Sequence, residues 1–350
     1  MRVLVTGGSG FIGSAMVRFL IADTDAHVLN LDKLTYAAIP EALAGVEHHS
    51  RYQFRQGDVA DRRLMHELFA RHRPDVVLHL AAESHVDRSI DTPSDFVMTN
   101  IVGTYAMLAA ALEYWRNLPQ PQRERFRFLH VSTDEVFGSL GSGGYFTEES
   151  RYAPNSPYAA SKASADHLVR AWGRTYGLPV VISNCSNNYG EFQFPEKLIP
   201  LMTLNALEGK PLPIYGRGDN VRDWLYVGDH VRALWLIATH GKIFETYNVG
   251  GNAERRNLEV AQSICDIVDN LRPWANGPRR NLIQFVADRP GHDHRYAIDP
   301  AKLARELGWR PIESFETGLK RTVEWYLTQQ DWWTRIRQQL YGGERLGLSA

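Results

Sequence analysis

Cysteines are scarce in this chain, and long apolar runs are missing. Its 350 residues include 2 cysteines, Cys185 and Cys265, which are too few for a disulfide framework and lack the spacing of metal ligands. We interpret both as buried thiols in a reducing compartment, and we expect a cytoplasmic location. No uninterrupted run of about 18 apolar residues is found. The first residues become glycine-rich too soon for a signal peptide. We therefore expect neither a membrane span nor a leader.

An excess of charge of one sign is also missing. Lys and Arg number 39 against 40 Asp and Glu, for a formal net charge of -1. This balance gives no general attraction to nucleic acid or to an anionic membrane, and we expect neither as a partner. An anionic ligand would need a local cluster of cations and backbone N–H groups. The paired histidines at 48–49 and the 292–294 stretch have no recognised metal-ligand frame, so we predict no metal.

Short apolar runs that alternate with helical patterns are what the sequence does contain. The runs are nearly continuous in apolar residues, which is typical of strands buried on both faces of a parallel sheet. The alternation predicts an α/β fold, a Rossmann-type doubly wound parallel sheet. Strands are predicted at 3–6, 28–31, 52–55, 76–80, 126–132 and 180–185. Helices are predicted at 14–22, 62–73, 96–115 and 157–176.

From about residue 187 onward the alternation of apolar runs and helical patterns becomes less regular, and prolines and glycines become frequent. We therefore predict a first domain at 1–186 and a smaller, interleaved C-terminal lobe at 187–340 that binds substrate. Later segments are expected to return to the first domain. Residues 341–350 are expected to fray.

A glycine fingerprint follows the first predicted strand. Gly7, Gly10 and Gly13 stand between that strand and a helix. They allow a tight turn, the approach of backbone to a pyrophosphate, and close helix packing. The next strand ends at Asp32, whose carboxylate suits ribose hydroxyls and would repel a 2′-phosphate, so NAD is favoured over NADP. Lys33 weakens that preference slightly, and a purely structural glycine turn is the alternative.

A tyrosine and a lysine lie four residues apart at the start of a predicted helix. Ser156 suits the N-cap and Pro157 the first turn, so Tyr158 and Lys162 project from one face. A nearby ammonium would lower the pKa of the Tyr158 phenol and make it a general base. By itself this spacing is more often an ordinary surface pair. The hydroxyl of Thr133, at the end of an upstream strand, favours the catalytic interpretation.

Two adjacent carboxylates, Asp134 and Glu135, follow Thr133 at that strand end. The exchange of a ketone and an alcohol needs no such pair. Elimination of water does, because a base must take a carbon-bound proton and an acid must protonate the leaving hydroxyl. Adjacent acids in different environments can hold different protonation states. The alternative is a solvated turn or a charge pair at a helix N-terminus.

Together these motifs resemble the extended short-chain dehydrogenase/reductase superfamily, whose members bind NAD(P) on a Rossmann domain. Longer stretches are closely similar to the family of dTDP-glucose 4,6-dehydratases over nearly the whole chain. These stretches are 31–36, 79–90, 133–135, 187–190, 194–200, 222–224 and 288–293.

The resemblance implies an NAD-dependent hydro-lyase that converts dTDP-glucose to dTDP-4-keto-6-deoxyglucose and water. Tyr158 would take the C4 hydroxyl proton during oxidation, Glu135 the C5 proton, and Asp134 would protonate the leaving C6 hydroxyl. The hydride then returns to C6, so NAD is regenerated within each cycle. A homodimer is implied as well, built from the helices at 96–115 and 157–176 of each copy.

The same resemblance implies a set of binding residues. For NAD they are Gly7, Gly10, Phe11, Ile12, Gly13, Asp32, Lys33, Thr35, Asp58, Val59, Leu80, Ala81, Ala82, Thr99, Tyr158, Lys162 and Asn188. For the glucosyl unit they are Ser84 and Thr133. For the nucleotide diphosphate they are Asn187, Lys197, Leu198, Pro213, Tyr215, Arg222, Asn257, Arg289 and His292.

Three departures from the family pattern bear on these expectations. Ala38-Ile39 replaces Gly-Asn near the expected adenosine end, Phe137 replaces a tyrosine, and 191–193 reads Glu-Phe-Gln. The first could alter cofactor affinity and the third nucleotide or sugar tolerance. Rival interpretations are a UDP-hexose 4-epimerase, a GDP-mannose or CDP-glucose dehydratase, or a non-catalytic NAD-binding regulator. An epimerase has no use for the acid pair, and a regulator has no reason to keep the whole catalytic set.

Overall fold

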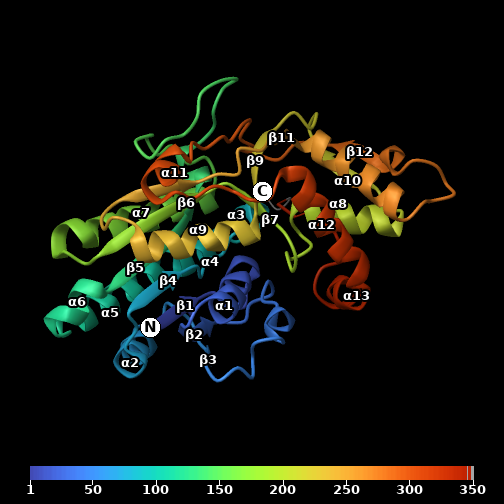
Figure 1. The fold of residues 1–350 in the computed structure, drawn as a ribbon. Helices are drawn as coiled ribbons and strands as arrows, with labels where there is room; N and C mark the ends of the chain where they lie inside the picture. Colours follow the sequence, from blue (N-terminus) through green and yellow to red (C-terminus); the bar gives the residue numbers. More distant parts are fainter. Residues whose placement is uncertain (345, 348–350) are drawn as a thin grey trace.

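A parallel sheet of seven strands forms the larger lobe of the computed structural model, which describes residues 1–344 and 346–347 (Figure 1). The strand order is β10-β6-β5-β4-β1-β2-β3, and every neighbouring pair is parallel. This confirms the predicted doubly wound fold. The strands are β1 (Arg2–Thr6), β2 (His27–Asp32), β3 (Tyr52–Gln56), β4 (Val76–His79), β5 (Arg127–Thr133), β6 (Val180–Cys185) and β10 (Thr246–Val249).

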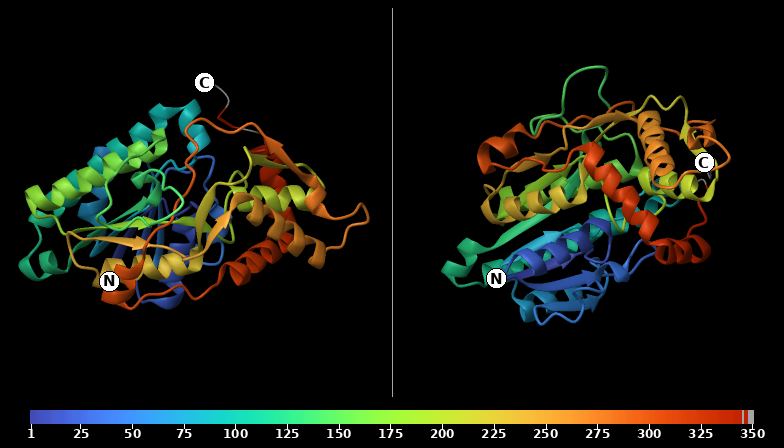
Figure 2. Two further views of the ribbon diagram at one scale, coloured as in Figure 1. Left: turned by 90° about the horizontal axis from the view of Figure 1, so that it is seen from above. Right: turned by 45° about the vertical axis from the view of Figure 1, so that its right-hand side comes forward.

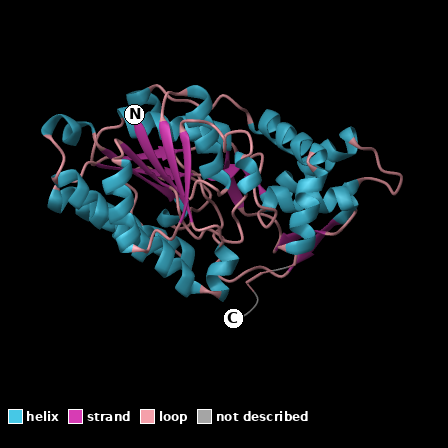
Figure 3. Ribbon diagram, turned by 90° about the horizontal axis from the view of Figure 1, so that it is seen from below, coloured by secondary structure: helices cyan, strands magenta, loops and turns pink. Residues whose placement is uncertain are grey.

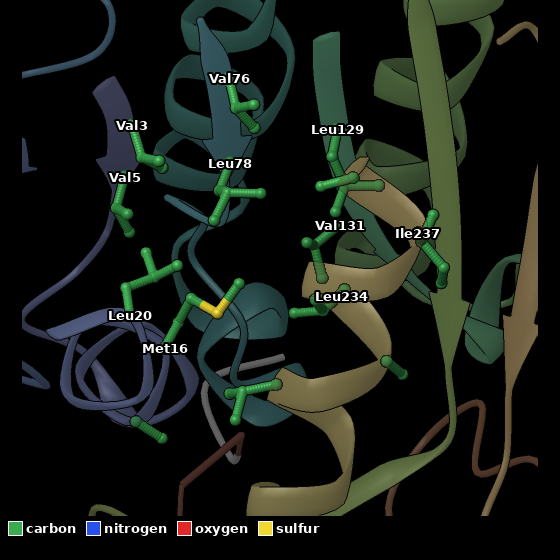
Figure 4. Packing of buried hydrophobic residues seen from close by; sticks show 14 of the residues in the cluster. Val3, Val5, Met16, Leu20, Val76, Leu78, Leu129, Val131, Leu234 and Ile237 are labelled. Atoms are coloured by element: carbon green, nitrogen blue, oxygen red, sulfur yellow. The ribbon is translucent and has the colours of Figure 1, made fainter. Parts of the chain in front are cut away.

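Helices cover both faces of this sheet (Figure 3). On one face α1 (Phe11–Asp23), α9 (Val227–His240) and α11 (Ala301–Leu307) bury their apolar sides. Figure 4 shows Met16, Leu20, Leu234 and Ile237 packed under alternate residues of β1, β4 and β5. On the other face lie α2 (Arg62–His72), α5 (Thr104–Arg116) and α7 (Pro157–Tyr176). Burial on both sides explains why these strands are almost wholly apolar.

One long helix runs along the second face and is irregular in its middle. It comprises α4 (Pro93–Phe96), a π-helical segment η2 (Val97–Gly103) and α5, and it follows the short α3 (Val86–Asp91). By length and composition alone, the 24 residues from 93 to 116 could cross a membrane. However, 56% of the most apolar window is buried inside the protein, as in the core helices of folded domains.

The second lobe lies beyond the carboxyl ends of the sheet strands (Figure 2). It contains a three-stranded sheet and a two-stranded sheet with four longer helices. The strands are β7 (Asn187–Tyr189), β9 (Val221–Tyr226), β11 (Glu254–Arg256), β8 (Leu212–Tyr215) and β12 (Ile283–Val286). The helices are α8 (Leu198–Glu208), α10 (Asn257–Leu271), α12 (Phe315–Thr328) and α13 (Gln330–Gln339). The short helical segments η1 (Pro40–Leu43), α6 (Gln120–Arg125) and η3 (Asp134–Phe137) belong to the larger lobe, and η4 (Arg279–Leu282) packs on α10 in the second lobe.

The chain passes between the two lobes more than once. After β9 it returns to the large sheet as α9 and β10, and later as α11, while the remaining segments belong to the second lobe. The expected fraying at the C-terminus was wrong for Tyr341. Its ring is buried and its hydroxyl donates a hydrogen bond to the backbone oxygen of Glu344. Residues 345 and 348–350 of that expected segment lie outside the described residues.

Candidate active site

A cavity of about 300 Å³ opens at the carboxyl ends of β1, β2, β4, β5 and β6, between the two lobes. This edge of an open α/β sheet is where ligands generally bind. Every residue expected to bind NAD lines this cavity: Gly7, Gly10, Phe11, Ile12, Gly13, Asp32, Lys33, Thr35, Asp58, Val59, Leu80, Ala81, Ala82, Thr99, Tyr158, Lys162 and Asn188.

The glycine loop at the start of α1 leaves no room for side chains. Gly7 has φ +71°, and a Cβ there would lie 2.8 Å from the backbone of Ala81. A Cβ on Gly13 would lie 1.9 Å from the carbonyl oxygen of Gly7. The first turn of α1 contains no acidic residue, and no side chain caps its N-terminus. Its free N–H groups therefore face the cavity and suit a pyrophosphate.

Asp32 ends β2 beside this loop. Its carboxylate accepts hydrogen bonds from the backbone N–H groups of Ser9 and Leu34, each at 2.8 Å. Each oxygen keeps further acceptor capacity for a ribose hydroxyl. Burial raises the pKa of Asp32, although these backbone hydrogen bonds oppose the shift. Lys33 forms an ion pair with Asp58 at 2.7 Å. Because Asp58 neutralises its charge, Lys33 does little to weaken the preference for NAD over NADP. The residues present thus fit NAD.

Tyr158 and Lys162 are both buried on α7, at the floor of the cavity. The Lys162 ammonium donates a hydrogen bond to the backbone oxygen of Val131 at 2.7 Å. Burial and the nearby Glu135 raise the pKa of Tyr158 well above its ordinary value, while a hydrogen bond with Thr133 lowers it. The expectation that Lys162 lowers this pKa was wrong for the protein alone. The Lys162 ammonium donates its hydrogen bond to the backbone oxygen of Val131, and burial is the largest influence on the pKa of Tyr158.

The acid pair sits in η3, directly after β5. Thr133 caps this turn, since its hydroxyl accepts a hydrogen bond from the backbone N–H of Glu135 at 3.3 Å. Asp134 is 1% exposed, and in the part of the chain that the structure describes its Oδ2 has no hydrogen-bond partner. Burial, then the charges of Glu135 and Asp223, raise its pKa well above the ordinary value. Such a carboxyl group retains its proton and can donate it.

Glu135 has a different environment, although it is the next residue. Its side chain lines the cavity, whereas Asp134 does not. Burial raises the pKa of Glu135, but the cations Arg289, Arg222 and Lys197 act in the opposite direction. The pKa rises further for Asp134 than for Glu135, so Asp134 is the carboxyl group that more readily keeps its proton, as the acid of such a pair requires.

The residues expected to bind substrate divide into two groups. Ser84, Thr133, Asn187 and Lys197 line the cavity. The others extend from it across the second lobe, on or beside β8, β9 and the starts of α8 and α10: Leu198, Pro213, Tyr215, Arg222, Asn257, Arg289 and His292. Among the described residues, Asn187 Oδ1 and Asn257 Oδ1 are buried without hydrogen-bond partners, so both oxygens could accept a hydrogen bond from a ligand.

Asp87 links part of this second group. Its carboxylate lies 3.1 Å from the Arg289 guanidinium and accepts a hydrogen bond from the Tyr215 hydroxyl at 3.3 Å. The ring of His292 lies against that of Tyr215, with centroids 6.2 Å apart. Arg289, Tyr215 and His292 thus come together although they are far apart in the sequence.

Several cavity residues were missed from the sequence. Among them are Glu83, Gln193, Phe194 and Glu196. Glu196 lies in the 194–200 stretch that resembles the family, so that stretch was the available signal. The Glu196 carboxylate accepts hydrogen bonds from Tyr36 at 3.0 Å and from Arg88 at 2.8 Å. The Arg88 guanidinium also lies 3.8 Å from the centre of the Tyr36 ring.

The departures from the family pattern are accommodated by packing. Ile39 is buried in an apolar cluster that includes Phe194 and Trp332. Phe192 has φ +63° and packs against Trp325, with ring centroids 4.6 Å apart. These side chains therefore support the cavity wall from behind. Among the described residues, no group of three or more His, Cys, Asp or Glu side chains could hold a metal ion.

Comparison with known proteins places this geometry in a family. Residues 4–322 match the family described as GDP-mannose 4,6 dehydratase. The chain belongs to this family. A protein named probable dTDP-glucose 4,6-dehydratase, from Sinorhizobium fredii, is 60% identical over 348 residues, 99% of each chain.

Solved structures similar to this chain have more than one activity. A dTDP-glucose 4,6-dehydratase from Streptomyces venezuelae with NAD bound is 46% identical, with a TM-score of 0.88 over 96% of this chain and 100% of that one. A UDP-glucose 4-epimerase from Thermus thermophilus in complex with NAD is 30% identical, with a TM-score of 0.82 over 94% and 100%. The fold alone therefore does not separate dehydratase from epimerase, and the residues of the site must do so.

Proposed function

We propose that this chain is an NAD-dependent hydro-lyase that converts dTDP-glucose to dTDP-4-keto-6-deoxyglucose and water. The observation that carries the proposal is the acid pair. Asp134 is buried beside other carboxylates, and Glu135 faces three cations. A 4-epimerase needs no such pair. The nearly full-length relative that is 60% identical and named probable dTDP-glucose 4,6-dehydratase supports the choice of nucleotide.

The residues of the cavity have separate tasks in this reaction. NAD, when bound, supplies the group that accepts a hydride from C4 and later returns it to C6. Tyr158 accepts the proton of the C4 hydroxyl as its phenolate, the form that its hydrogen bond with Thr133 favours, and Thr133 also orients the C4 oxygen. The resulting 4-ketone makes the C5 proton acidic, and Glu135 removes it and returns a proton to C5 when the hydride adds to C6. Asp134 does not line the cavity, so its retained proton passes through the Thr133 hydroxyl, which lines the cavity and lies 3.4 Å from Asp134 Oδ1, to the leaving C6 hydroxyl, and water departs.

The cations of the second lobe hold the nucleotide diphosphate. Arg222 and Arg289 can each bind two phosphate oxygens through the guanidinium fork. Lys162 and Asp32 line the cavity and would bind ribose hydroxyls of NAD. Because the hydride returns within one cycle, the cofactor need not leave, and we expect the purified protein to contain bound NAD.

A substrate panel without added NAD tests the proposal. We expect purified protein to convert dTDP-glucose to a 4-keto product, detected by its absorbance in alkali. UDP-, GDP- and CDP-glucose and GDP-mannose serve as the comparison set. Turnover of one of these with none of dTDP-glucose would refute the proposed substrate.

A homodimer is the assembly we propose. Helix α7 packs beside the long helix of α4, η2 and α5. This helical layer exposes Val97, Met98 and Tyr176 with 46%, 52% and 41% of their surface accessible. A second copy placing the same face against it would cover these apolar side chains. We also propose a cytoplasmic location, in which the free thiols of Cys185 and Cys265 stay reduced.

A further inference from the structure

Gln193 lines the cavity and is 7% exposed, and no role has yet been given to it. Its Nε2 donates a hydrogen bond to the backbone oxygen of Asn188 at 2.9 Å. Because a carbonyl oxygen can only accept, this contact fixes which end of the side-chain amide is the nitrogen. Within the described part of the chain, the oxygen at the other end, Oε1, has no hydrogen-bond partner. A buried acceptor of this kind costs free energy unless a ligand supplies the donor.

The loop that carries Gln193 is held by buried aromatic side chains. The ring of Phe194, the next residue, packs edge-on against that of Tyr36, with centroids 5.6 Å apart. The Tyr326 hydroxyl, from α12, donates a hydrogen bond to the backbone oxygen of Gln193 at 2.6 Å. The protein therefore sets the position of Gln193 before any ligand binds.

Asn188, to which Gln193 donates, has its own side chain engaged. Asn188 Nδ2 donates a hydrogen bond to the backbone oxygen of Ser186 at 3.0 Å. Asn188 Oδ1 accepts one from His230 Nδ1 at 2.9 Å, and burial lowers the pKa of this histidine to about 3, so its ring is neutral. Both ends of the Asn188 amide are thus bound within the protein, whereas Gln193 keeps an acceptor for a ligand.

The place of Gln193 along the sheet indicates which end of NAD it meets. The glycine loop that suits the pyrophosphate follows β1, and Asp32, which suits a ribose, ends β2. Asn188 lies just after β6, on the opposite side of β1 from β2. Tyr158, beside which the proposed hydride transfer takes place, is on α7, and α7 packs on β5 and β6. The nicotinamide end of the cofactor therefore belongs on the side of Gln193.

The carboxamide is the group with N–H donors at the nicotinamide end of NAD. We propose that Gln193 binds this carboxamide, with Oε1 accepting a hydrogen bond from its NH2 group. By holding the carboxamide, Gln193 prevents rotation of the ring about its bond to ribose, so that one face of the ring both receives the hydride and returns it. The placing of the ring beside Tyr158 rests on the proposed function, but the hydrogen bond can be tested without substrate.

Exchange of the bound cofactor tests this hydrogen bond. Purified protein is equilibrated with equal, saturating amounts of NAD and its acetylpyridine analogue, in which a methyl group replaces the carboxamide NH2. After free dinucleotide is removed, mass spectrometry gives the ratio of the two bound forms. We expect the wild type to prefer NAD by about 5-fold or more, the usual effect of one hydrogen bond. Equal binding of the two by the wild type would overturn the proposal without any variant.

Gln193→Met removes the acceptor and keeps the length of the side chain. This variant should bind NAD and the analogue equally, and a preference as large as that of the wild type would overturn the proposal. Tyr326→Phe is the matched control, because it removes the hydroxyl that holds the backbone of the same loop and leaves the Gln193 amide in place. It should keep the preference for NAD. Loss of the preference in Tyr326→Phe as well would assign it to the loop instead of Oε1, which would also overturn the proposal.

Turnover distinguishes the cofactor from the sugar as the source of the donor. With dTDP-glucose, Gln193→Met should lower kcat and leave KM near that of the wild type. A raised KM together with a wild-type preference for NAD would assign Oε1 to a sugar hydroxyl and overturn the proposal. Absence of turnover with dTDP-glucose in the wild type would refute the proposed function and leave the exchange experiment decisive.

Discussion

Two carboxyl groups that follow one another in the chain need not share one chemistry. Asp134 has other carboxylates as neighbours, whereas Glu135 faces Arg222, Arg289 and Lys197. The difference arises because the backbone of η3 directs one side chain into the protein and the other into the cavity. At the scale of single residues, this asymmetry separates the proposed acid from the proposed base.

Replacing Glu135, the proposed base, should stop the reaction between the C4 oxidation and the loss of water. In Glu135→Gln the C4 oxidation should still proceed, because it depends on Tyr158. Loss of water should slow by at least about 100-fold, the usual contribution of general base catalysis. Absorbance of reduced nicotinamide should therefore accumulate on the enzyme after dTDP-glucose is added, while the dehydrated product should not. Glu67→Gln, on the partly exposed α2, is the control, and dehydration at the normal rate in Glu135→Gln would contradict the assignment.

Replacing the acid should stabilise the protein near neutral pH. The folded pKa of Asp134 is raised, so above about pH 4 the unfolded chain releases this proton first. Wild-type stability therefore declines from that pH upward, through the folded pKa. Asp134→Asn removes this cost, and we expect Tm to rise by roughly 1–3 °C at pH 7.

Thermal unfolding of Asp134→Asn at pH 7 and at pH 4 checks the sign of this effect. The gain over the wild type should shrink at pH 4, where the unfolded Asp134 also holds its proton. A lower Tm at pH 7 would mean that the ionised carboxylate stabilises the fold.

At the scale of elements, one cluster joins segments that bind different ligands. Tyr36 belongs to the loop after β2, Arg88 to α3, and Glu196 to the loop before α8. Their hydrogen bonds and the stacking of Arg88 on Tyr36 connect the cofactor side of the cavity to its substrate side. The Glu196 side chain is 2% exposed, so the ion pair is well shielded from water on one side.

Removing Arg88 should loosen both sides of the cavity together. In Arg88→Ala the buried Glu196 loses its cation, and Tyr36 loses the group stacked on it. We expect the purified variant to carry several-fold less NAD and to show a raised KM for the nucleotide sugar. Arg71→Ala, which removes an exposed ion pair within α2, is the matched control. An Arg88→Ala protein with full NAD content would show that the cluster does not couple the two sides.

The elements that were foreseen from the sequence are those with strong local patterns. The apolar run at 180–185 became β6 with the same bounds, and the predicted helix at 157–176 is α7. β10, by contrast, has only four residues and joins the sheet by pairing with β6. The sequence of such a short strand does not indicate which other strand it will pair with, so β10 was not predicted. The π-helical turns of η2 were missed too, because the apolar pattern of that helix continues through them.

The residues of the site likewise divide into those that a local sequence pattern predicts and those that depend on contacts between distant segments. Asp32 and the glycines were predictable because their roles depend on position within a few residues of a strand end. Glu196 was not identified, because its partners Tyr36 and Arg88 lie 160 and 108 residues away. Asp87 likewise meets Arg289 across 202 residues. Contacts of this kind exist only once the two lobes are folded against one another.

At the scale of the whole molecule, the exposed apolar face of the long helix should set the oligomeric state. A charge at Met98 would be buried without a partner in the proposed dimer, and it costs little on a free surface. We expect Met98→Glu to be a monomer by light scattering after size exclusion, and the wild type to be a dimer. Phe285→Glu, at an equally exposed position on β12, should remain a dimer. A monomeric wild type would contradict the proposed assembly.

The repeated passage of the chain between the lobes also governs how the molecule can come apart. Backbone crosses from the sheet to the second lobe after β6, returns after β9, and crosses again after β10. A protease that cleaves one of these crossings nicks the chain, but the fragments still share a sheet and cannot separate without unfolding. A single cut therefore cannot separate the two lobes, because neither is made of one continuous segment of the chain.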